Sequence, residues 1–138
     1  MKNYLLLLFL SVTGITLAIA QTPSKALFHK YENKNGVNLS VSSGVTTMSI
    51  DKDDDDRDVR KIFKKISKDC IKLLNNKNYK TLVFEKEEND ITKISSYEKN
   101  GYVEMCILEI SDDSLTLTST LMDASTAQSS QGIQLNKN

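Results

Sequence analysis

The stretch ITKISSYEK-NG-YVEMCILEI-SDDS-LTLTSTL, residues 91–121, decides the fold of this 138-residue chain. Two short turns separate three segments rich in β-branched, aromatic and aliphatic residues, which is the pattern of an antiparallel meander. Asn100-Gly101 is the strongest two-residue signal for a hairpin turn. This turn and the SDDS loop together predict the register: Lys99 pairs with Tyr102, Tyr97 with Glu104, Ser95 with Cys106, Ile91 with Ile110, Ile110 with Leu115, Leu108 with Leu117, and Cys106 with Ser119.

The two faces of the predicted meander differ in polarity, because successive side chains of a strand point to opposite sides of a sheet. One face has Tyr102, Cys106, Leu108, Ile110, Leu115, Leu117 and Leu121. The reverse face is apolar only along its middle, at Ile94, Val103, Met105 and Ile107, next to Thr116, Thr118 and Thr120. A slip of one residue would bury the threonines, so the first face is the expected core. The four apolar residues of the reverse face, 94, 103, 105 and 107, are the candidate interaction patch. They are either open to a partner or a second copy, or covered by the N-terminal helix.

An amphipathic helix is predicted over residues 59–74. Its apolar residues recur at steps of three and four, and lysines fill the other faces. These apolar residues are Val59, Ile62, Phe63, Ile66, Cys70, Leu73 and Leu74. Ile71 lies off this stripe, so the alternative is a helix that stops near Ser67, followed by a short strand over residues 70–74.

Shorter elements complete the expected fold. Thr22 and Pro23 indicate the start of a short helix, with the Thr22 hydroxyl as its cap. Alternating residues over 37–41 and 45–50 predict a hairpin, and the β-prone run at 79–86 predicts a strand that leads into the meander. We therefore expect an α+β fold, a mainly antiparallel sheet with a C-terminal three-stranded meander and two helices packed on one face.

The first 20 residues have the pattern of a secretory signal peptide. Lys2 precedes apolar residues, and an Ala-Ile-Ala triplet at 18–20 supplies the small residues that a signal peptidase requires. We expect cleavage between residues 20 and 21 and a periplasmic or secreted product. An uncleaved anchor is the alternative, but the apolar run is interrupted and short for a span of about 20 apolar residues. The single α+β domain is placed at residues 21–122, and the polar residues 123–138 are expected to form a disordered tail.

The acidic stretch DKDDDDRD, residues 51–58, has two interpretations. Asp51, Asp53 and Asp55 match the first, third and fifth ligand positions of a helix-loop-helix calcium site. However, an Asp replaces the glycine at the sixth position and an Ile replaces the glutamate at the twelfth. The other interpretation is that these carboxylates precede and cap the helix that follows. The three aspartates are therefore weak metal candidates.

Cys70 and Cys106 are candidates for a disulfide, because one lies on the apolar stripe of the helix and the other on the core face of the meander. An oxidising compartment would permit the bond, which would stabilise the fold by about 3–4 kcal/mol in the chain-entropy model. The alternative is two buried free thiols that act as small apolar residues. The sequence leaves both open.

No motif for catalysis is present in the sequence. Its single histidine, His29, has no second histidine for a metal site or relay, and there is no C-x-x-C or G-x-S-x-G motif. The 18 basic and 18 acidic residues balance, so no bulk field favours a nucleic acid. We expect no catalytic residue, no cofactor and no nucleic-acid partner.

The order of these segments is also informative. Residues 27–37 read LFHKYENKNGV, a Phe-x-Lys-Tyr helix followed by a Gly-Val strand start, and residues 105–110 form an aliphatic strand. In these features the chain resembles the secreted bacterial proteins of domain-of-unknown-function family 4252, found mainly in Bacteroidota. Thr-Leu-Met-Asp at 120–123 stands where that family has a Gly-Asp ending, and the middle section is shorter. The resemblance implies an envelope location and an α+β fold, but no activity and no site residue.

The expected function is therefore that of an exported, non-catalytic binding or envelope-associated protein. Its partner is an unidentified envelope protein or a second copy of the chain. The alternatives are a calcium-dependent adhesion module that uses the acidic stretch, and an enzyme whose site the sequence does not disclose.

Overall fold

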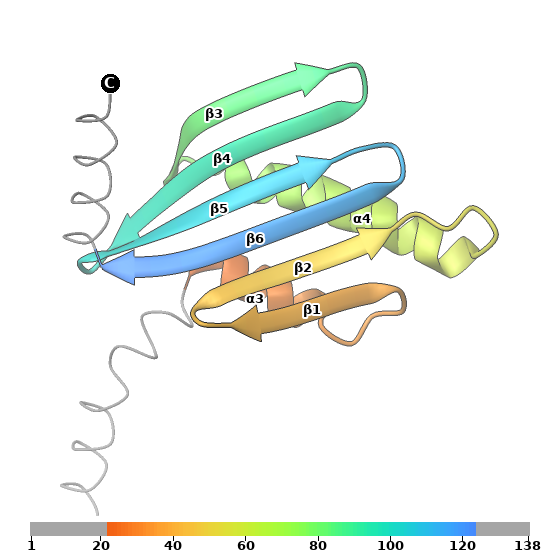
Figure 1. Ribbon diagram of the computed structural model, residues 1–138, viewed down its shortest axis with the longest axis horizontal. Coiled ribbons are helices and arrows are strands. Elements are labelled where there is room, and N and C mark those ends of the chain that lie inside the picture. The colour runs from red at the N-terminus through yellow and green to blue at the C-terminus, as the bar shows by residue number, and fades with distance from the viewer. Residues whose placement is uncertain (1–21, 124–138) are drawn as a thin grey trace, which may run out of the picture.

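The computed structural model describes residues 22–123, which form two helices and six strands (Figure 1). In chain order these are α3 (Pro23–Tyr31), β1 (Val37–Ser42), β2 (Val45–Asp51), α4 (Arg57–Leu74), β3 (Tyr79–Glu87), β4 (Asp90–Lys99), β5 (Tyr102–Ile110) and β6 (Ser114–Asp123). The predicted signal peptide and most of the predicted tail lie outside the described residues. The predicted tail begins one residue too early, because Asp123 is the last residue of β6.

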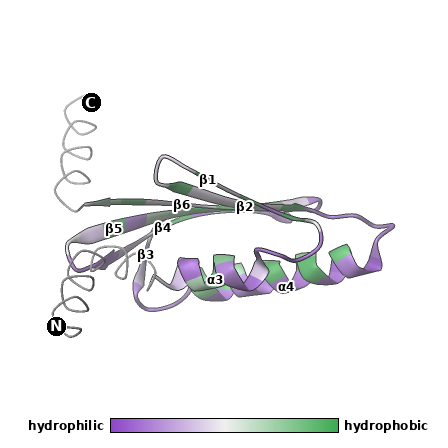
Figure 2. Ribbon diagram, turned by 90° about the horizontal axis from the view of Figure 1, so that it is seen from below, coloured by the Kyte–Doolittle hydropathy of each residue, from purple (hydrophilic) through white to green (hydrophobic). Residues whose placement is uncertain are grey.

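The six strands form one antiparallel sheet in the order β1-β2-β6-β5-β4-β3. Both helices lie against the same face of this sheet, and the other face is not covered by any described element (Figure 2). The α+β class and the antiparallel sheet are thus confirmed. The arrangement has two layers, which is enough to bury one face of a sheet. Within the described chain, β1 and β3 are the two edge strands.

The meander has the register that its turns predict. All the predicted pairs are present, from Lys99 opposite Tyr102 to Cys106 opposite Ser119. Asn100 and Gly101 both have positive φ, 54° and 79°, as a two-residue type I′ turn requires. Side chains of β5 alternate between the core and the other face, so the predicted assignment of faces is also confirmed.

Helix α4 begins at an acidic cap and continues without a break to its predicted end. The Asp56 carboxylate accepts hydrogen bonds from the backbone N–H groups of Asp58 and Val59, which the first turn of a helix leaves unsatisfied. The helix ends at Leu74, so the alternative of a strand over residues 70–74 is wrong. Ile71 is 37% exposed, as its place off the apolar stripe requires.

Helix α3 begins where Thr22 and Pro23 predict, but the prediction that the Thr22 hydroxyl caps it was wrong. The Thr22 side chain makes no capping hydrogen bond, and its hydroxyl instead lies 3.4 Å from Ser24 Oγ. The backbone carbonyl of Thr22 accepts the N–H of Lys25. Ser24, Leu27, Phe28 and Tyr31 are the buried residues of this helix. Its hydroxyl-rich first turn is therefore directed into the protein.

The core lies between the sheet and the two helices. It includes Met48, Ile50, Leu108, Leu115 and Leu117 from the central strands and Phe63, Ile66 and Leu74 from α4. Strand β3 takes little part in it, because only Tyr79 of its nine residues is buried. A bulge between Thr81 and Val83 shifts the register of this edge strand against β4. Such a bulge interrupts the regular ladder at an edge.

Candidate functional site

The candidate interaction patch lies on the uncovered face of the sheet. Ile94 pairs with Ile107 between β4 and β5, and Val103 and Met105 lie on the same face of β5. All four side chains are half-buried, although no described helix lies over them. The N-terminal helix α3 lies on the opposite side (Figure 2). The alternative that α3 covers this patch is therefore wrong.

Uncharged hydroxyl residues border this patch along β6 and β2. Thr118 lies opposite Ile107, Thr120 lies opposite Met105, and Thr47 continues the row on β2. On its other side, Val83 of the edge strand pairs with Ile94 and is 37% exposed. Glu98, opposite Val103, and Glu109, beyond Ile107, are the charged residues at the two ends of the stripe. An apolar centre with a polar border is typical of a protein interface.

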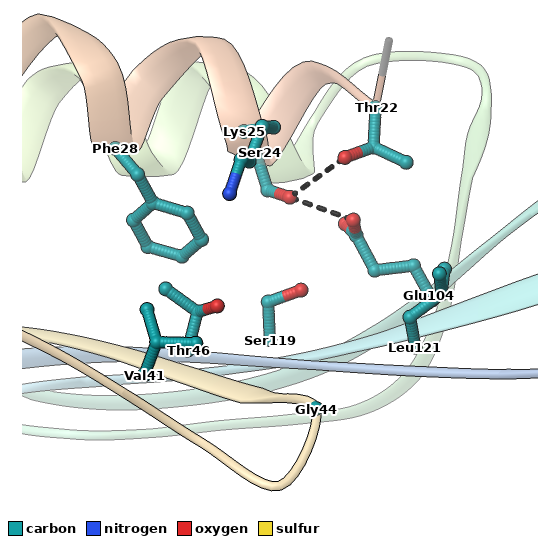
Figure 3. A pocket seen from close by; sticks show the side chains of 10 residues that line it. All are labelled: Thr22, Ser24, Lys25, Phe28, Val41, Gly44, Thr46, Glu104, Ser119 and Leu121. Atoms are coloured by element: carbon teal, nitrogen blue, oxygen red, sulfur yellow. Dashed lines mark hydrogen bonds between the residues drawn. The ribbon is translucent and has the colours of Figure 1, made fainter. Parts of the chain in front are cut away.

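A pocket of about 260 Å³ lies on the other side of the sheet, between the first turn of α3 and the ends of β2, β5 and β6 (Figure 3). Figure 3 shows the Ser24 hydroxyl of the helix facing Glu104 of the sheet, and the Phe28 ring lying over Thr46 and Val41. Lys25 of the same helix also lines the pocket. Val41, Gly44, Thr46 and Leu121 complete its walls, with Thr22 beside Ser24.

Glu104 is the central polar residue of this pocket and is only 2% exposed. Its Oε2 accepts a hydrogen bond from Ser24 Oγ at 2.7 Å. Its Oε1 accepts two more, from Tyr79 Oη and Cys106 Sγ, both at 2.9 Å. No lysine, arginine or histidine within residues 22–123 forms an ion pair with this carboxylate. Hydrogen bonds and the nearby N-terminus of α3 therefore compensate the buried charge.

The two donors on Oε1 are held in their protonated forms. Burial first, and then the negative charges nearby, raise the pKa of the Tyr79 hydroxyl well above its usual range. Burial also raises the pKa of the Cys106 thiol, and the charge of Glu104 adds to this effect. A protonated hydroxyl and a protonated thiol are hydrogen-bond donors, which is what a buried carboxylate requires.

Sequence reasoning missed Glu104 and its donors. The predicted register places Glu104 on the core face of β5, between Tyr102 and Cys106, so the alternation already indicated a buried charge there. No sequence pattern indicates Ser24 or Tyr79 as its partners, because they lie 80 and 25 residues away in the chain.

The acidic stretch forms no cluster in the structure. Asp51, Asp53 and Asp55 are exposed, and Asp53 Oδ1 accepts the backbone N–H of Asp55. Within residues 22–123 no group of three or more histidine, cysteine, aspartate or glutamate side chains is arranged to hold a metal ion. The capping interpretation applies to Asp56, whose carboxylate binds the first turn of α4.

Cys70 and Cys106 are both fully buried in the same core, and neither forms a disulfide in the structure. Burial first, and then the negative charge of Asp69, raise the pKa of the Cys70 thiol to about 12. His29 lies on the exposed side of α3, where its ring is 3.4 Å from the Glu32 carboxylate. Among the described residues, no helix is long and apolar enough to cross a lipid bilayer.

No protein-family model matches this chain, and no curated protein is found as a relative. The resemblance to family 4252 therefore stays a prediction.

Proposed function

We propose that this protein is exported to the cell envelope, where it acts as a non-catalytic binding protein through the open face of its sheet. The observation that supports this most strongly is the uncovered patch formed by Ile94, Val103, Met105 and Ile107. Apolar residues that are contiguous on a surface and bordered by polar residues favour contact with another protein. The signal-like N-terminus supports export to the periplasm or the medium.

A second copy of the chain is the partner that this face fits first. An isologous interface requires a patch that is complementary to itself, and an apolar stripe whose charges, Glu98 and Glu109, lie only at its two ends meets that condition. Two such faces can pack as stacked sheets about 10 Å apart, with the helices on the outside. The half-buried stripe of each copy would then lie in the middle of a four-layer assembly.

The test uses photo-crosslinking at single positions of the protein expressed from its full chain. A photoreactive amino acid at Ile107 is compared with one at Lys68, which is exposed on α4. The proposal expects a discrete product from position 107 and none from position 68. A product of twice the chain mass identifies a second copy, and a discrete product of another mass identifies a different envelope protein. No product from position 107, in cells and in the purified protein, would contradict the proposal.

A pair of aspartate variants tests the same face in solution. Met105→Asp places a charge in the patch, whereas Thr47→Asp places one on the same face, two strands away on β2. We expect Met105→Asp to lower the sedimentation coefficient or abolish the crosslink, and Thr47→Asp to have little effect. Circular dichroism shows whether both variants remain folded. A folded Met105→Asp variant that still crosslinks through position 107 would argue against the patch.

A further inference from the structure

The pocket beside Glu104 lies on the opposite face of the sheet from the interaction patch, and the proposed function does not use it. It differs from two other hollows of the described chain in having a buried charged side chain in its wall. A hollow of about 390 Å³ beside α4, for example, is lined by the exposed lysines at 34, 61 and 65, and its one buried polar group, Tyr31, is already bonded to Asp69. Surface lysines alone do not form a binding site.

Among residues 22–123, the hydrogen bonds to Glu104 leave one of its acceptor positions open. A carboxylate offers about four lone-pair positions to donors. Oε1 accepts two hydrogen bonds, from Tyr79 and Cys106, whereas Oε2 accepts one, from Ser24. Oε2 lies at the Ser24 side of the pocket, where Figure 3 shows the Glu104 carboxylate beside the open space. An N–H donor in the pocket therefore has an acceptor available on a buried side chain.

The other residues that line the pocket indicate which further chemical groups the ligand carries. The half-buried Lys25 lines the same pocket and would repel a simple amine, but it attracts a carboxylate. Phe28 and Leu121 provide apolar walls, and Ser119 provides a hydroxyl whose oxygen also interacts with the Cys106 thiol. The volume of about 260 Å³ is below the range of about 300–1,000 Å³ that holds drug-sized ligands, so the ligand is small.

We propose that this pocket binds a small zwitterion with an apolar side chain, of the class of free α-amino acids. The ligand's ammonium group donates to Glu104 Oε2 and its carboxylate faces the Lys25 ammonium. Its side chain lies against Phe28 and Leu121. Each part of the ligand meets a wall of matching chemistry, whereas an amine or a carboxylic acid alone meets one matching charge and one opposing charge.

The experiment measures the affinity of three related probes by isothermal titration calorimetry, with the protein expressed from its full 138-residue chain. The probes are L-leucine, isopentylamine, which lacks the carboxylate of leucine, and 4-methylpentanoate, which lacks its ammonium group. We expect leucine to bind at least about tenfold more tightly than either fragment, a difference of about 1.4 kcal/mol or more. Valine, phenylalanine and the other common amino acids are titrated in the same way, because the apolar residues Phe28 and Leu121 do not select one particular side chain of the ligand.

Two variants test whether Lys25 binds the carboxylate of the ligand and Glu104 binds its ammonium group. Lys25→Ala should reduce the affinity for leucine to that for isopentylamine, and Glu104→Gln should reduce it to that for 4-methylpentanoate. Lys34→Ala, at an exposed lysine outside this pocket, is the matched control and should bind as the wild type does. If Glu104→Gln fails to fold, Lys25→Ala still decides the question, because the Lys25 ammonium forms no ion pair with another residue of the described range 22–123. The proposal is overturned if no amino acid binds at millimolar concentration, or if Lys25→Ala binds leucine with unchanged affinity.

Discussion

Tyr79 Oη donates a hydrogen bond to Glu104 Oε1 across the intervening strand β4. The two residues lie in one row of the sheet, because Tyr79 pairs with Tyr97 and Tyr97 pairs with Glu104. The rings of Tyr79 and Tyr97 pack against each other, 5.2 Å apart between centroids and tilted by 40°. This row connects the start of the edge strand β3 to the middle of the sheet.

Tyr79→Phe should destabilise the protein by about 1–3 kcal/mol, because it leaves a buried carboxylate with one donor fewer. Urea unfolding followed by circular dichroism measures the change. Tyr97→Phe is the control, since it retains the ring contact and the hydroxyl of Tyr97 does not bond to Glu104; we expect a change below about 0.5 kcal/mol. Equal effects of the two substitutions would show that the bond to Glu104 is not what Tyr79 contributes.

Gly36 and Gly44 differ in how much space surrounds them: Gly36 lies close to the Val59 side chain, whereas Gly44 has no close neighbour among the described residues. Both have positive φ, 85° and 79°, in which a side chain is strained by about 1–2 kcal/mol. A Cβ added at Gly36 would lie 3.1 Å from both methyl groups of Val59, whereas one added at Gly44 would meet nothing within 4 Å. We expect Gly36→Ala to destabilise more than Gly44→Ala in the same urea assay. The double variant Gly36→Ala, Val59→Ala should reduce the extra loss; if it does not, crowding against Val59 is not the cause.

The parts of this fold that follow from local patterns could be predicted from the sequence. Asn100-Gly101 fixes the first turn of the meander because few residues tolerate two successive positive φ angles, and the rest of the register follows from it. The extent of α4 follows from the spacing of its apolar residues. The prediction that the Thr22 hydroxyl caps α3 was wrong, because a hydroxyl near a helix start can also hydrogen-bond to a neighbouring side chain, here Ser24.

The pocket could be predicted only in part, because it depends on contacts between distant segments. The predicted register already put Glu104 on the buried face, but its donors Ser24 and Tyr79 come from α3 and β3, and no local pattern encodes where these elements lie relative to β5.

Lys93 is a second buried charged residue whose partner could not be predicted from a local pattern. It is only 9% exposed, and its ammonium donates to Asn75 at the C-terminal end of α4, a favourable site for a cation.

The two cysteines should behave as buried free thiols. Burial raises the pKa of both, to about 12 for Cys70, so little reactive thiolate exists at neutral pH. We expect almost no reaction with a colorimetric thiol reagent in the native protein and two thiols per chain in strong denaturant. Fewer than two thiols in denaturant, restored to two by a reductant, would show that the predicted Cys70–Cys106 disulfide forms.

The contact between α3 and α4 should make stability depend on pH in both directions. Tyr31 Oη and Lys30 Nζ both donate to Asp69 Oδ2. Burial alone would raise the pKa of Asp69, but the hydrogen bonds from Lys30 and Tyr31 outweigh it and lower that pKa below its ordinary 3.8. A lowered pKa stabilises the fold above pH 3.8, and this contribution is lost as the pH falls towards the folded value.

Tyr31 affects the pH dependence of stability in the opposite direction, because its pKa is raised and that of Asp69 is lowered. Burial first, and then its bond to the charged Asp69, raise the pKa of the Tyr31 hydroxyl above its ordinary 10.0. The unfolded chain therefore releases this proton at lower pH than the folded protein does. The contribution of Tyr31 is complete below pH 10 and is lost as the pH rises beyond it.

Tyr31→Phe should therefore flatten the alkaline fall in stability and also weaken the acid fall, because Asp69 loses one of its two donors. Urea unfolding between about pH 3 and pH 11 measures both slopes of the unfolding free energy, which are proportional to the difference in bound protons between the unfolded and folded states. Tyr102→Phe is the control, since Tyr102 is only half-buried and is not bonded to a carboxylate. A second variant, Asp69→Asn, should remove the acid slope of this contact while leaving a tyrosine that is still buried. If Tyr31→Phe and Tyr102→Phe change the alkaline slope equally, the Tyr31–Asp69 bond does not control it, and the loss at high pH would arise from the other buried groups, Tyr79 and the two thiols.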